Sequence, residues 1–291
     1  GCNNFCTYCI VPYVRGRERS RTFESVVSEC KLLAADGVRE ITLLGQNVNS
    51  YGRDVYGSPR FAELVRAVGE TGVERIRFTS SNPKDLSDEV IAAMAETPAV
   101  MPHLHLAVQS GSTRVLKAMN RRYTREQYLE LVSRLRSAMP DLALSTDVIV
   151  GFPGEEEEDF LQTLSLVREA AFSSAFTFIY SKRPGTPAAQ IVDPTPHEVI
   201  QDRFDRLAEQ VAQQAHDANQ KELGGSVLAL VEGSSKRDDA VLVGHSEKNQ
   251  TVHFSAPEGV DPSSLVGRIC EVHVDEARTW YLRGTMVGDP R

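Results

Sequence analysis

The sequence predicts an α/β protein, with an open, partial barrel of parallel strands and outer helices followed by a small all-β barrel. Helical and extended patterns alternate from Thr22 to about Tyr180 with short loops between them, which favours a parallel sheet covered by helices. A long polar helix follows and ends at Gly224-Gly225. From Ser226 onward, short strands recur at hairpin spacing, a pattern typical of a small β barrel.

The alternating part is expected to contain five strands and five helices. The predicted strands are 40–44, 75–79, 103–108, 142–150 and 175–180, and the predicted helices are 24–36, 60–71, 87–96, 124–139 and 155–171. Ser87 and Thr124 are suitable helix N-caps, and Gln127 completes a capping box with Thr124. A sixth strand is expected just before Gly1, outside this chain, which makes a partial (β/α)6 barrel rather than a complete eight-fold one.

The last part of the chain is expected to form a separate domain. The long helix is predicted over 198–223, the strands over 227–231, 240–243, 251–254 and 269–274, and a fifth strand over 276–283. We therefore predict two domains, at residues 1–222 and 223–291. The acidic run 155–158 is expected to be a solvated first helical turn that complements the helix dipole.

Composition and charge exclude several classes of protein. The 291 residues carry a net charge of −8, which excludes a generally basic nucleic-acid coat but leaves room for local basic patches. No apolar run approaches the roughly 20 residues that span a bilayer, and no charged-then-apolar leader is present. The chain begins at Gly1 without an initiator Met, so we expect it to be the later part of a longer protein.

Three of the five cysteines are clustered. Cys2, Cys6 and Cys9 form a C-x3-C-x2-C pattern, which is a poor disulfide framework and a good ligand set for a reducing, cytoplasmic setting. Thiolates suit iron–sulfur clusters, and three of them leave one iron of a four-iron cluster open for a cosubstrate. A structural zinc and three incidental buried cysteines are the alternatives. Cys30 and Cys270 are expected to be packing residues.

These residues carry a family resemblance. C-x3-C-x-aromatic-C, with Tyr8 before the last cysteine, resembles the motif of the radical S-adenosylmethionine (SAM) enzymes, and the longer string 1–21 resembles the methylthiotransferases among them. The strings 43–52, 108–112, 147–155 and 183–187 are similar to the tRNA branch of that family, the 2-methylthio-N6-isopentenyladenosine synthases. Ala107 and Asn82 depart from the residues expected beside two of these strings, and neither departure removes a ligand.

The resemblance implies a radical SAM barrel with a terminal TRAM domain, an RNA-binding β barrel. The implied enzyme is an iron–sulfur-dependent transferase that uses a 5′-deoxyadenosyl radical from SAM to add a methylthio group to carbon 2 of isopentenylated adenosine beside the anticodon of tRNA. A second [4Fe-4S] cluster is expected only in an N-terminal domain that this chain lacks, so we expect the chain alone to cleave SAM without completing methylthiolation. The implied partners are the tRNA anticodon stem-loop and a reductant protein such as flavodoxin or ferredoxin, and we expect a monomer without a membrane partner.

The same resemblance assigns residues at the ends of the strands. Active sites of α/β barrels lie at the carboxyl ends of the strands, where polar residues follow four of the predicted strands. The SAM site is implied to use Tyr8, Gln46, Ser80, Gln109, Ser110, Asp147, Ile149 and Gly151. Each of these residues has an alternative role as a turn or helix cap. His103 and His105 share a strand face, and we expect them to be packing or pocket histidines rather than a metal pair.

Arginine and lysine clusters are the candidates for RNA contact. Arg15, Arg17, Arg19 and Arg21 alternate, which on an extended backbone would place them on one side. Arg121 and Arg122 belong to a second cluster with Lys117 and Arg125, and Lys236 and Arg237 lie in a predicted turn of the β domain. Solvated surface is the alternative for each cluster. The alternative functions are methylthiolation of a ribosomal-protein aspartate or of another tRNA adenosine, and a non-catalytic RNA-binding module.

Overall fold

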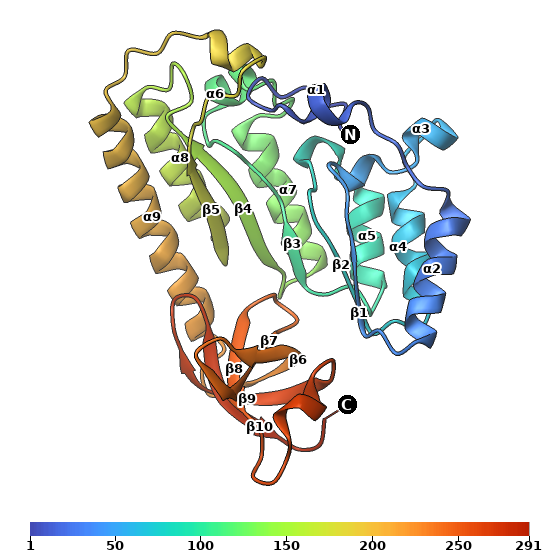
Figure 1. Ribbon diagram of the computed structural model, residues 1–291. Helices are drawn as coiled ribbons and strands as arrows, with labels where there is room; N and C mark the ends of the chain where they lie inside the picture. The colour runs from blue at the N-terminus through green and yellow to red at the C-terminus, as the bar shows by residue number, and fades with distance from the viewer. Residues whose placement is uncertain (291) are drawn as a thin grey trace.

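The structure, a computed structural model, describes residues 1–290 as an α/β part followed by a β barrel (Figure 1). The α/β part has parallel strands in the order β1-β2 and β3-β4-β5. Single bridges from Ile76 to Val100 and from Ser81 to Leu106 link the two groups. The strands are β1 (Glu40–Leu43), β2 (Arg75–Phe78), β3 (His103–His105), β4 (Ala143–Val150) and β5 (Ser174–Ile179).

Helices cover one face of these strands. They are α1 (Val11–Arg15), α2 (Phe23–Ala35), α3 (Arg53–Tyr56), α4 (Phe61–Gly69), α5 (Asp88–Glu96), α6 (Thr113–Ala118), α7 (Arg125–Ala138), α8 (Glu157–Ala170) and α9 (His197–Gln220). Short 3-10 turns are η1 (Val48–Ser50), η2 (Pro83–Asp85), η3 (Pro187–Gln190) and η4 (Pro262–Leu265). The opposite face of the strands, which we call the inner face, carries polar and aromatic side chains that the helices do not cover.

The predicted α/β order is confirmed, with the sixth strand outside the described residues and still a prediction. The capping box of Thr124 and Gln127 is present at the start of α7. The short helices α1, α3 and α6 were not expected, because helices of six residues or fewer leave little periodic pattern. The third strand is shorter than the predicted 103–108, since β3 ends at His105 and only isolated bonds continue the pairing, such as Leu106 N–H to the Ser145 carbonyl at 2.8 Å.

The C-terminal part is a closed barrel with the strand order β10-β8-β7-β6-β9. Its strands are β6 (Ser226–Ser235), β7 (Asp238–His245), β8 (Thr251–Ser255), β9 (Ile269–Ala277) and β10 (Leu282–Val287). The fifth strand lies later than the predicted 276–283. Pairing with β10 carries β9 on to Ala277, and a turn closed by the Arg278 N–H to the Tyr281 carbonyl then occupies half of the predicted range.

Two separate apolar cores hold the two parts. One extends from Cys30 to Val211 through the strands and helices of the α/β part, and the other from Val227 to Leu282 inside the barrel. Within residues 1–290 the structure has no helix that is both long and apolar enough to cross a bilayer. Helix α9 runs along the α/β part and leads into the barrel, which lies beyond the amino ends of the strands (Figure 1).

Two buried arginines of β2 join the α/β part to the barrel. Arg75 donates to the carbonyls of Leu228 at 2.7 Å and His245 at 3.2 Å, and Arg77 donates to Ser246 and Glu247 carbonyls at 2.7 and 3.1 Å. Arg77 also pairs with Glu40 at 2.9 Å. Because charge-assisted bonds that are shielded from water are strong, these contacts fix the barrel against the amino ends of the strands.

Candidate active site

The cysteine loop, residues 2–9, lies at the carboxyl ends of the strands and is held by distant parts of the chain. The N–H and hydroxyl of Thr7 donate to the carbonyls of Met119 at 3.0 Å and Ala118 at 2.9 Å, so the end of α6 fixes the middle of the loop. The Ala188 N–H at η3 donates to the Thr7 carbonyl at 2.9 Å. The side-chain amide of Asn120 donates to the Phe5 carbonyl at 2.9 Å. The loop is therefore positioned before any ligand binds.

The three thiols of this loop are free and mostly shielded. Cys2 and Cys6 are buried and Cys9 is half-buried, and no disulfide joins them. Burial raises the pKa of the Cys2 and Cys9 thiols above their ordinary value. Within residues 1–290 no group of three His, Cys, Asp or Glu side chains, the three cysteines included, is already arranged around one point as the ligands of a metal ion would be.

The guanidinium of Arg121 contacts one of these thiols. Its Nη1 lies 3.6 Å from the Cys6 sulfur, its Nη2 donates to the Ala107 carbonyl at 2.7 Å, and its Nε donates to the Tyr123 hydroxyl at 2.8 Å. The Tyr123 hydroxyl in turn donates to the Val108 carbonyl at 2.8 Å. The side chain that was grouped with the surface arginines thus lies inside the site. Sequence reasoning missed this role because 115 residues separate the two partners and no local pattern signals the contact.

Strained backbone collects around the same loop. Among the described non-glycine residues with positive φ, four lie near the carboxyl ends of the α/β strands: Phe5 (51°), Ser80 (63°), Gln109 (71°) and Asn120 (56°). Such conformations each cost on the order of 1–3 kcal/mol and concentrate where a ligand site requires them. The ends of β2 and β3 therefore resemble a built site rather than ordinary turns.

Aromatic and aliphatic side chains connect the cysteine loop to the inner face. Tyr8 packs with Ile149 and Tyr180 against a small buried cluster formed by Val115, Met119, Phe152 and Ala188. Burial raises the pKa of Tyr8 well above its usual value, so its hydroxyl stays neutral. Ile149 lies on the inner face of β4, and its N–H donates to the Gln109 carbonyl at 2.9 Å, which ties the end of β3 to the middle of the site.

A polar row lies further down the inner face. The His105 Nε2 lies 3.3 Å from a carboxylate oxygen of Asp147, and both His103 and His105 hydrogen-bond to the Ser145 hydroxyl at 3.1 and 3.0 Å. Burial, followed by the charges of Arg77 and His105, lowers the pKa of His103 to about 3. The two histidines are thus satisfied by hydrogen bonds, as the packing interpretation expects, and Asp147 keeps a free oxygen toward the inner face.

Two residues assigned to the SAM pocket, Ser110 and Gly151, have structural partners of their own. Ser110 is fully buried, with its hydroxyl 3.4 Å from that of Thr163, so this side chain supports the loop against α8. Gly151 has φ of 69°, and a Cβ there would lie 2.6 Å from Ile200 of α9. Ser80 is half-buried, and its backbone adopts the left-handed conformation in the turn that follows β2.

The prediction of a fully solvated turn at 155–158 is wrong for Glu155. Its side chain is buried, accepts the Gly151 N–H at 2.7 Å and lies 3.7 Å from Arg203 of α9. Burial raises its pKa to about 7. The carboxyl group ties the loop after β4 to α9, a long-range contact that the acidic run did not reveal.

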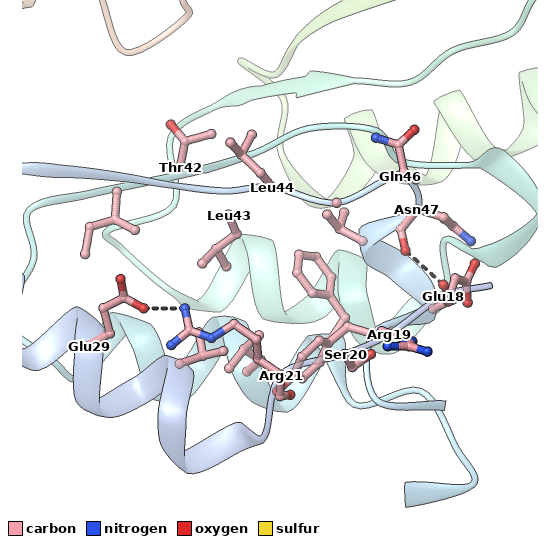
Figure 2. A pocket seen from close by; sticks show the side chains of 18 of the residues that line it. Glu18, Arg19, Ser20, Arg21, Glu29, Thr42, Leu43, Leu44, Gln46 and Asn47 are labelled. Atoms are coloured by element: carbon pink, nitrogen blue, oxygen red, sulfur yellow. Dashed lines mark hydrogen bonds and ion pairs between the residues drawn. The ribbon is translucent and has the colours of Figure 1, made fainter. Parts of the chain in front are cut away.

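A cavity lies beside the edge strand β1. It has a volume of about 480 Å³ and is bounded by α2, β1 and the 18–21 segment. Figure 2 shows Leu43 facing Arg21 and Glu29 on one side of the strand, with Thr42, Leu44 and Gln46 on the other. Gln46 is therefore exposed on the inner side of β1, at the carboxyl end of the strand.

The other basic residues are dispersed. Arg15 ends α1, Arg17 lies over the Phe5 ring at 4.7 Å, and Arg21 pairs with Glu29, so the four alternating arginines do not form one extended row. Arg19 borders the cavity. Arg122, Lys117, Lys236 and Arg237 are exposed, whereas Arg125 is bound to Glu169 and other groups of α8.

Comparison with known proteins identifies the family. The model of the radical SAM superfamily matches residues 1–167, which include the cysteine loop and strands β1 to β4. The chain belongs to the radical SAM superfamily. A TRAM domain model matches residues 220–287, the closed barrel. The radical SAM superfamily implies SAM and a [4Fe-4S] cluster as cofactors, so the expected fold and first cofactor pair agree with the comparison.

Relatives of this radical SAM chain carry a specific name. It is 51% identical over 288 residues to the tRNA-2-methylthio-N(6)-dimethylallyladenosine synthase of Acetivibrio thermocellus, a match that covers 99% of this chain and 59% of that protein. The protein of the same name from Carboxydothermus hydrogenoformans is also 51% identical over 288 residues, covering 99% and 64%. The chain therefore spans about three fifths of the length of these relatives.

Solved structures share the fold at low identity. A radical SAM methyltransferase from Kitasatospora setae matches with a TM-score of 0.54 and 18% identity, covering 65% of this chain and 37% of that one. Coproporphyrinogen III oxidase from Escherichia coli matches with a TM-score of 0.54 and 13% identity, covering 94% and 65%. These likenesses support the fold alone.

The residues present fit a four-iron cluster at the cysteine loop. Three thiols on one preformed loop supply the soft ligands that such clusters require. The guanidinium of Arg121 beside Cys6 offers a positive charge to an anionic centre. The open inner face beside Tyr8 and Ile149 leaves room for a cosubstrate on the same side of the loop.

Proposed function

We propose that this chain is the radical SAM and TRAM portion of a tRNA methylthiotransferase that adds a methylthio group to carbon 2 of N6-dimethylallyladenosine beside the anticodon. The observation that carries the proposal is the 51% identity over 99% of the chain to proteins of that name. The cysteine loop, with three free thiols and Arg121 in contact with Cys6, gives the same assignment a chemical basis.

The chain's own residues would act by holding and orienting. Cys2, Cys6 and Cys9 would ligate the cluster, and Arg121 bonds to Cys6. When bound, the cluster and SAM would supply a 5′-deoxyadenosyl radical for hydrogen abstraction from an unreactive carbon. Tyr8 and Ile149 form an apolar seat beside the loop. Asp147, with an oxygen 3.3 Å from His105, would accept hydrogen bonds from the hydroxyls of a ribose.

The remaining site residues would complete the SAM pocket. Gln109 and Ser80 present backbone in left-handed conformations at the ends of β3 and β2, and Gln46 ends β1 on the inner side. Gly151 brings the loop after β4 close to α9, and Ser110 supports the Gln109 turn through Thr163. Together these contacts keep water away from the reacting carbon and fix the cosubstrate, which is the protein's share of cofactor chemistry.

The β barrel would bind the tRNA. We keep the domain boundary between residues 222 and 223, which the two separate cores support. Exposed Lys236 and Arg237 in the barrel, and Arg15, Arg17, Arg19 and Arg122 near the loop, are the proposed phosphate contacts. The barrel and the cysteine loop lie at opposite ends of β4, whose eight residues span about 26 Å, so one tRNA stem-loop would have to reach along the open inner side.

The complete protein would contain more than this chain. We propose a second cluster and its own cysteines in the part of the protein that corresponds to the remaining two fifths of the relatives. A flavodoxin- or ferredoxin-like reductant would supply electrons to a monomeric, cytoplasmic enzyme. Residues 1–291 alone would then cleave SAM but would not complete the methylthio transfer.

Reconstitution and mass spectrometry test the proposal. The full-length protein, loaded anaerobically with iron and sulfide and then reduced, should convert stem-loop RNA carrying N6-dimethylallyladenosine to the 2-methylthio form. Conversion of an aspartate-containing ribosomal peptide, with no change in the RNA, would instead support the protein-modifying alternative. Tight RNA binding without SAM cleavage would support the non-catalytic module.

A further inference from the structure

Two exposed aromatic side chains on the inner face of β5 have no role in the site described so far. Phe176 is 59% exposed and Phe178 is 49% exposed, while their neighbour Ala175 packs toward the main core and α9 packs against the strand. The two rings therefore point away from the helices, toward the open side of the strands. We call Phe176 and Phe178 the aromatic wall.

The strand register places the aromatic wall directly beside proposed SAM residues. In the parallel pairing of β4 and β5, Asp147 lies opposite Phe176 and Ile149 lies opposite Phe178. Since paired residues of parallel strands project from the same face, both rings share the inner face with Asp147 and Ile149. The His105 ring lies 6.0 Å from the Phe176 ring, between centroids.

A short chain of contacts leads from the cysteines to the wall. Tyr8, between Cys6 and Cys9, and Ile149 pack against the same small buried cluster, and Ile149 is the strand neighbour of Phe178. Phe176 follows one inward-facing position below Phe178. The aromatic wall therefore begins beside a residue that shares a buried cluster with Tyr8 of the cysteine loop.

Exposed apolar surface of this kind usually marks a binding site. We propose that Phe176 and Phe178 receive the apolar N6 substituent of the substrate adenosine and so make the enzyme selective for the prenylated base; this inference rests on the proposed function. The product named for the relatives carries a dimethylallyl group on N6. This group is a branched hydrocarbon, and contact with aromatic rings would remove its apolar surface from water.

The geometry of adenine is compatible with contact between its N6 substituent and the aromatic wall. Carbon 2 and carbon 6 of adenine are both bonded to N1, and the bonds that leave them diverge within the ring plane. When carbon 2 faces the cosubstrate, the N6 substituent therefore extends sideways, along a wall rather than behind the base. Asp147 and His105, adjacent to Phe176, supply polar groups for the base edge or ribose without crossing the apolar surface.

Binding of two stem-loop RNAs to the reconstituted chain tests this inference. One RNA carries N6-dimethylallyladenosine and the other plain adenosine at the same position, and fluorescence anisotropy gives each Kd under anaerobic conditions with SAM present. The wild-type chain should prefer the prenylated RNA by about 100-fold. Phe176→Ser and Phe178→Ser should each reduce this preference about tenfold or more, through the Kd for the prenylated RNA alone.

Two further variants act as controls. Leu161→Ser removes an apolar side chain of similar exposure (49%) from the outer helix α8, and it should leave the preference unchanged. Phe176→Leu and Phe178→Leu keep the wall apolar and should retain most of the preference. Thermal unfolding of every variant establishes that the fold is intact.

Several outcomes would overturn the inference. Equal wild-type affinity for the two RNAs, or equal loss of both affinities in the serine variants, would show that the wall does not recognise the N6 group. A higher Kd for SAM with unchanged RNA preference would assign the wall to the cosubstrate. If wild-type releases 5′-deoxyadenosine but lacks the preference, only this inference fails; if it neither binds either RNA nor cleaves SAM, the proposed function fails as well.

Discussion

The guanidinium of Arg121 lies 3.6 Å from the sulfur of Cys6, although 115 residues separate the two along the chain. The same guanidinium also bonds to the Ala107 carbonyl and to Tyr123. One side chain therefore connects the cysteine loop to the end of β3, where the strained turn at Gln109 begins. Replacing Arg121 should therefore change both the charge beside Cys6 and the position of the cysteine loop.

Replacing Arg121 should make the cluster harder to reduce. A nearby positive charge and an N–H to a ligand sulfur both stabilise the reduced, more negative state. Arg121→Met should lower the midpoint potential by about 60 mV, the shift that corresponds to a tenfold change in a one-electron equilibrium. Redox titration followed by electron paramagnetic resonance measures this value.

The neighbouring arginine provides the control. Arg122 is exposed, so Arg122→Met makes the same chemical change one residue away and should leave the potential within about 10 mV of the wild-type value, because exposed charges are screened. Identical potentials for the two variants would refute the role assigned to Arg121.

The two arginines of β2 should determine how firmly the β barrel is held. Each donates to two backbone carbonyls of the barrel, and Arg77→Met would also leave Glu40 without its partner. The double variant Arg75→Met/Arg77→Met should lose about 3 kcal/mol of unfolding free energy and expose the 221–225 turn to proteases. Urea unfolding and limited proteolysis measure the two effects.

Arg66→Met is the matched control for this interface. Arg66 pairs with Glu96 at the surface, with side chains 41% and 64% exposed, and such pairs contribute about 0–1 kcal/mol. If the double variant had the same free energy of unfolding and the same resistance to proteolysis as wild type, the two arginines would not hold the domains together.

His103 should make the fold less stable in mild acid. Burial, with Arg77 and His105 as smaller causes, lowers its pKa to about 3, whereas the unfolded chain protonates near the ordinary value of 6.5. Between pH 7 and pH 5 the unfolded state gains a proton at His103 that the folded state does not. Protonation of His103 in the unfolded state should therefore lower the free energy of unfolding by about 2 kcal/mol over this pH range.

The prediction is read from a difference between two proteins. Glu155, with its pKa raised to about 7 by burial, acts in the opposite direction and gains stability as the pH falls, so the total change in wild type mixes both groups. Urea unfolding of wild type and His103→Gln at several pH values isolates the histidine. Parallel pH profiles for the two proteins would contradict the buried, neutral state of His103.

Local sequence patterns were sufficient for the longer helices and most strands, and for the grouping of three cysteines. Thr124 and Gln127 marked the start of α7 through their own hydrogen bonds, and the spacing of Cys2, Cys6 and Cys9 placed all three on one short loop. Such features depend on residues a few positions apart, which is why they can be recognised without a structure.

Contacts between distant segments could not be predicted in this way. Arg121 was expected at the surface because it lies in a basic run, yet its partner is Cys6. Glu155 was expected in solvent because it begins an acidic run, yet it is buried against Arg203. Charged residues are placed by the three-dimensional arrangement of partners that can offset the cost of burial, and that arrangement is absent from any short window of sequence.

Release of 5′-deoxyadenosine from SAM by the reconstituted, reduced chain tests the central claim most directly. The account predicts about four irons per chain and release of 5′-deoxyadenosine that depends on the reductant. Cys6→Ser should lose both the iron and the release, whereas Cys270→Ala, which alters a buried cysteine of the β barrel, should keep both. Release that persists in Cys6→Ser, or a chain loaded with four irons that leaves SAM intact, would contradict the account.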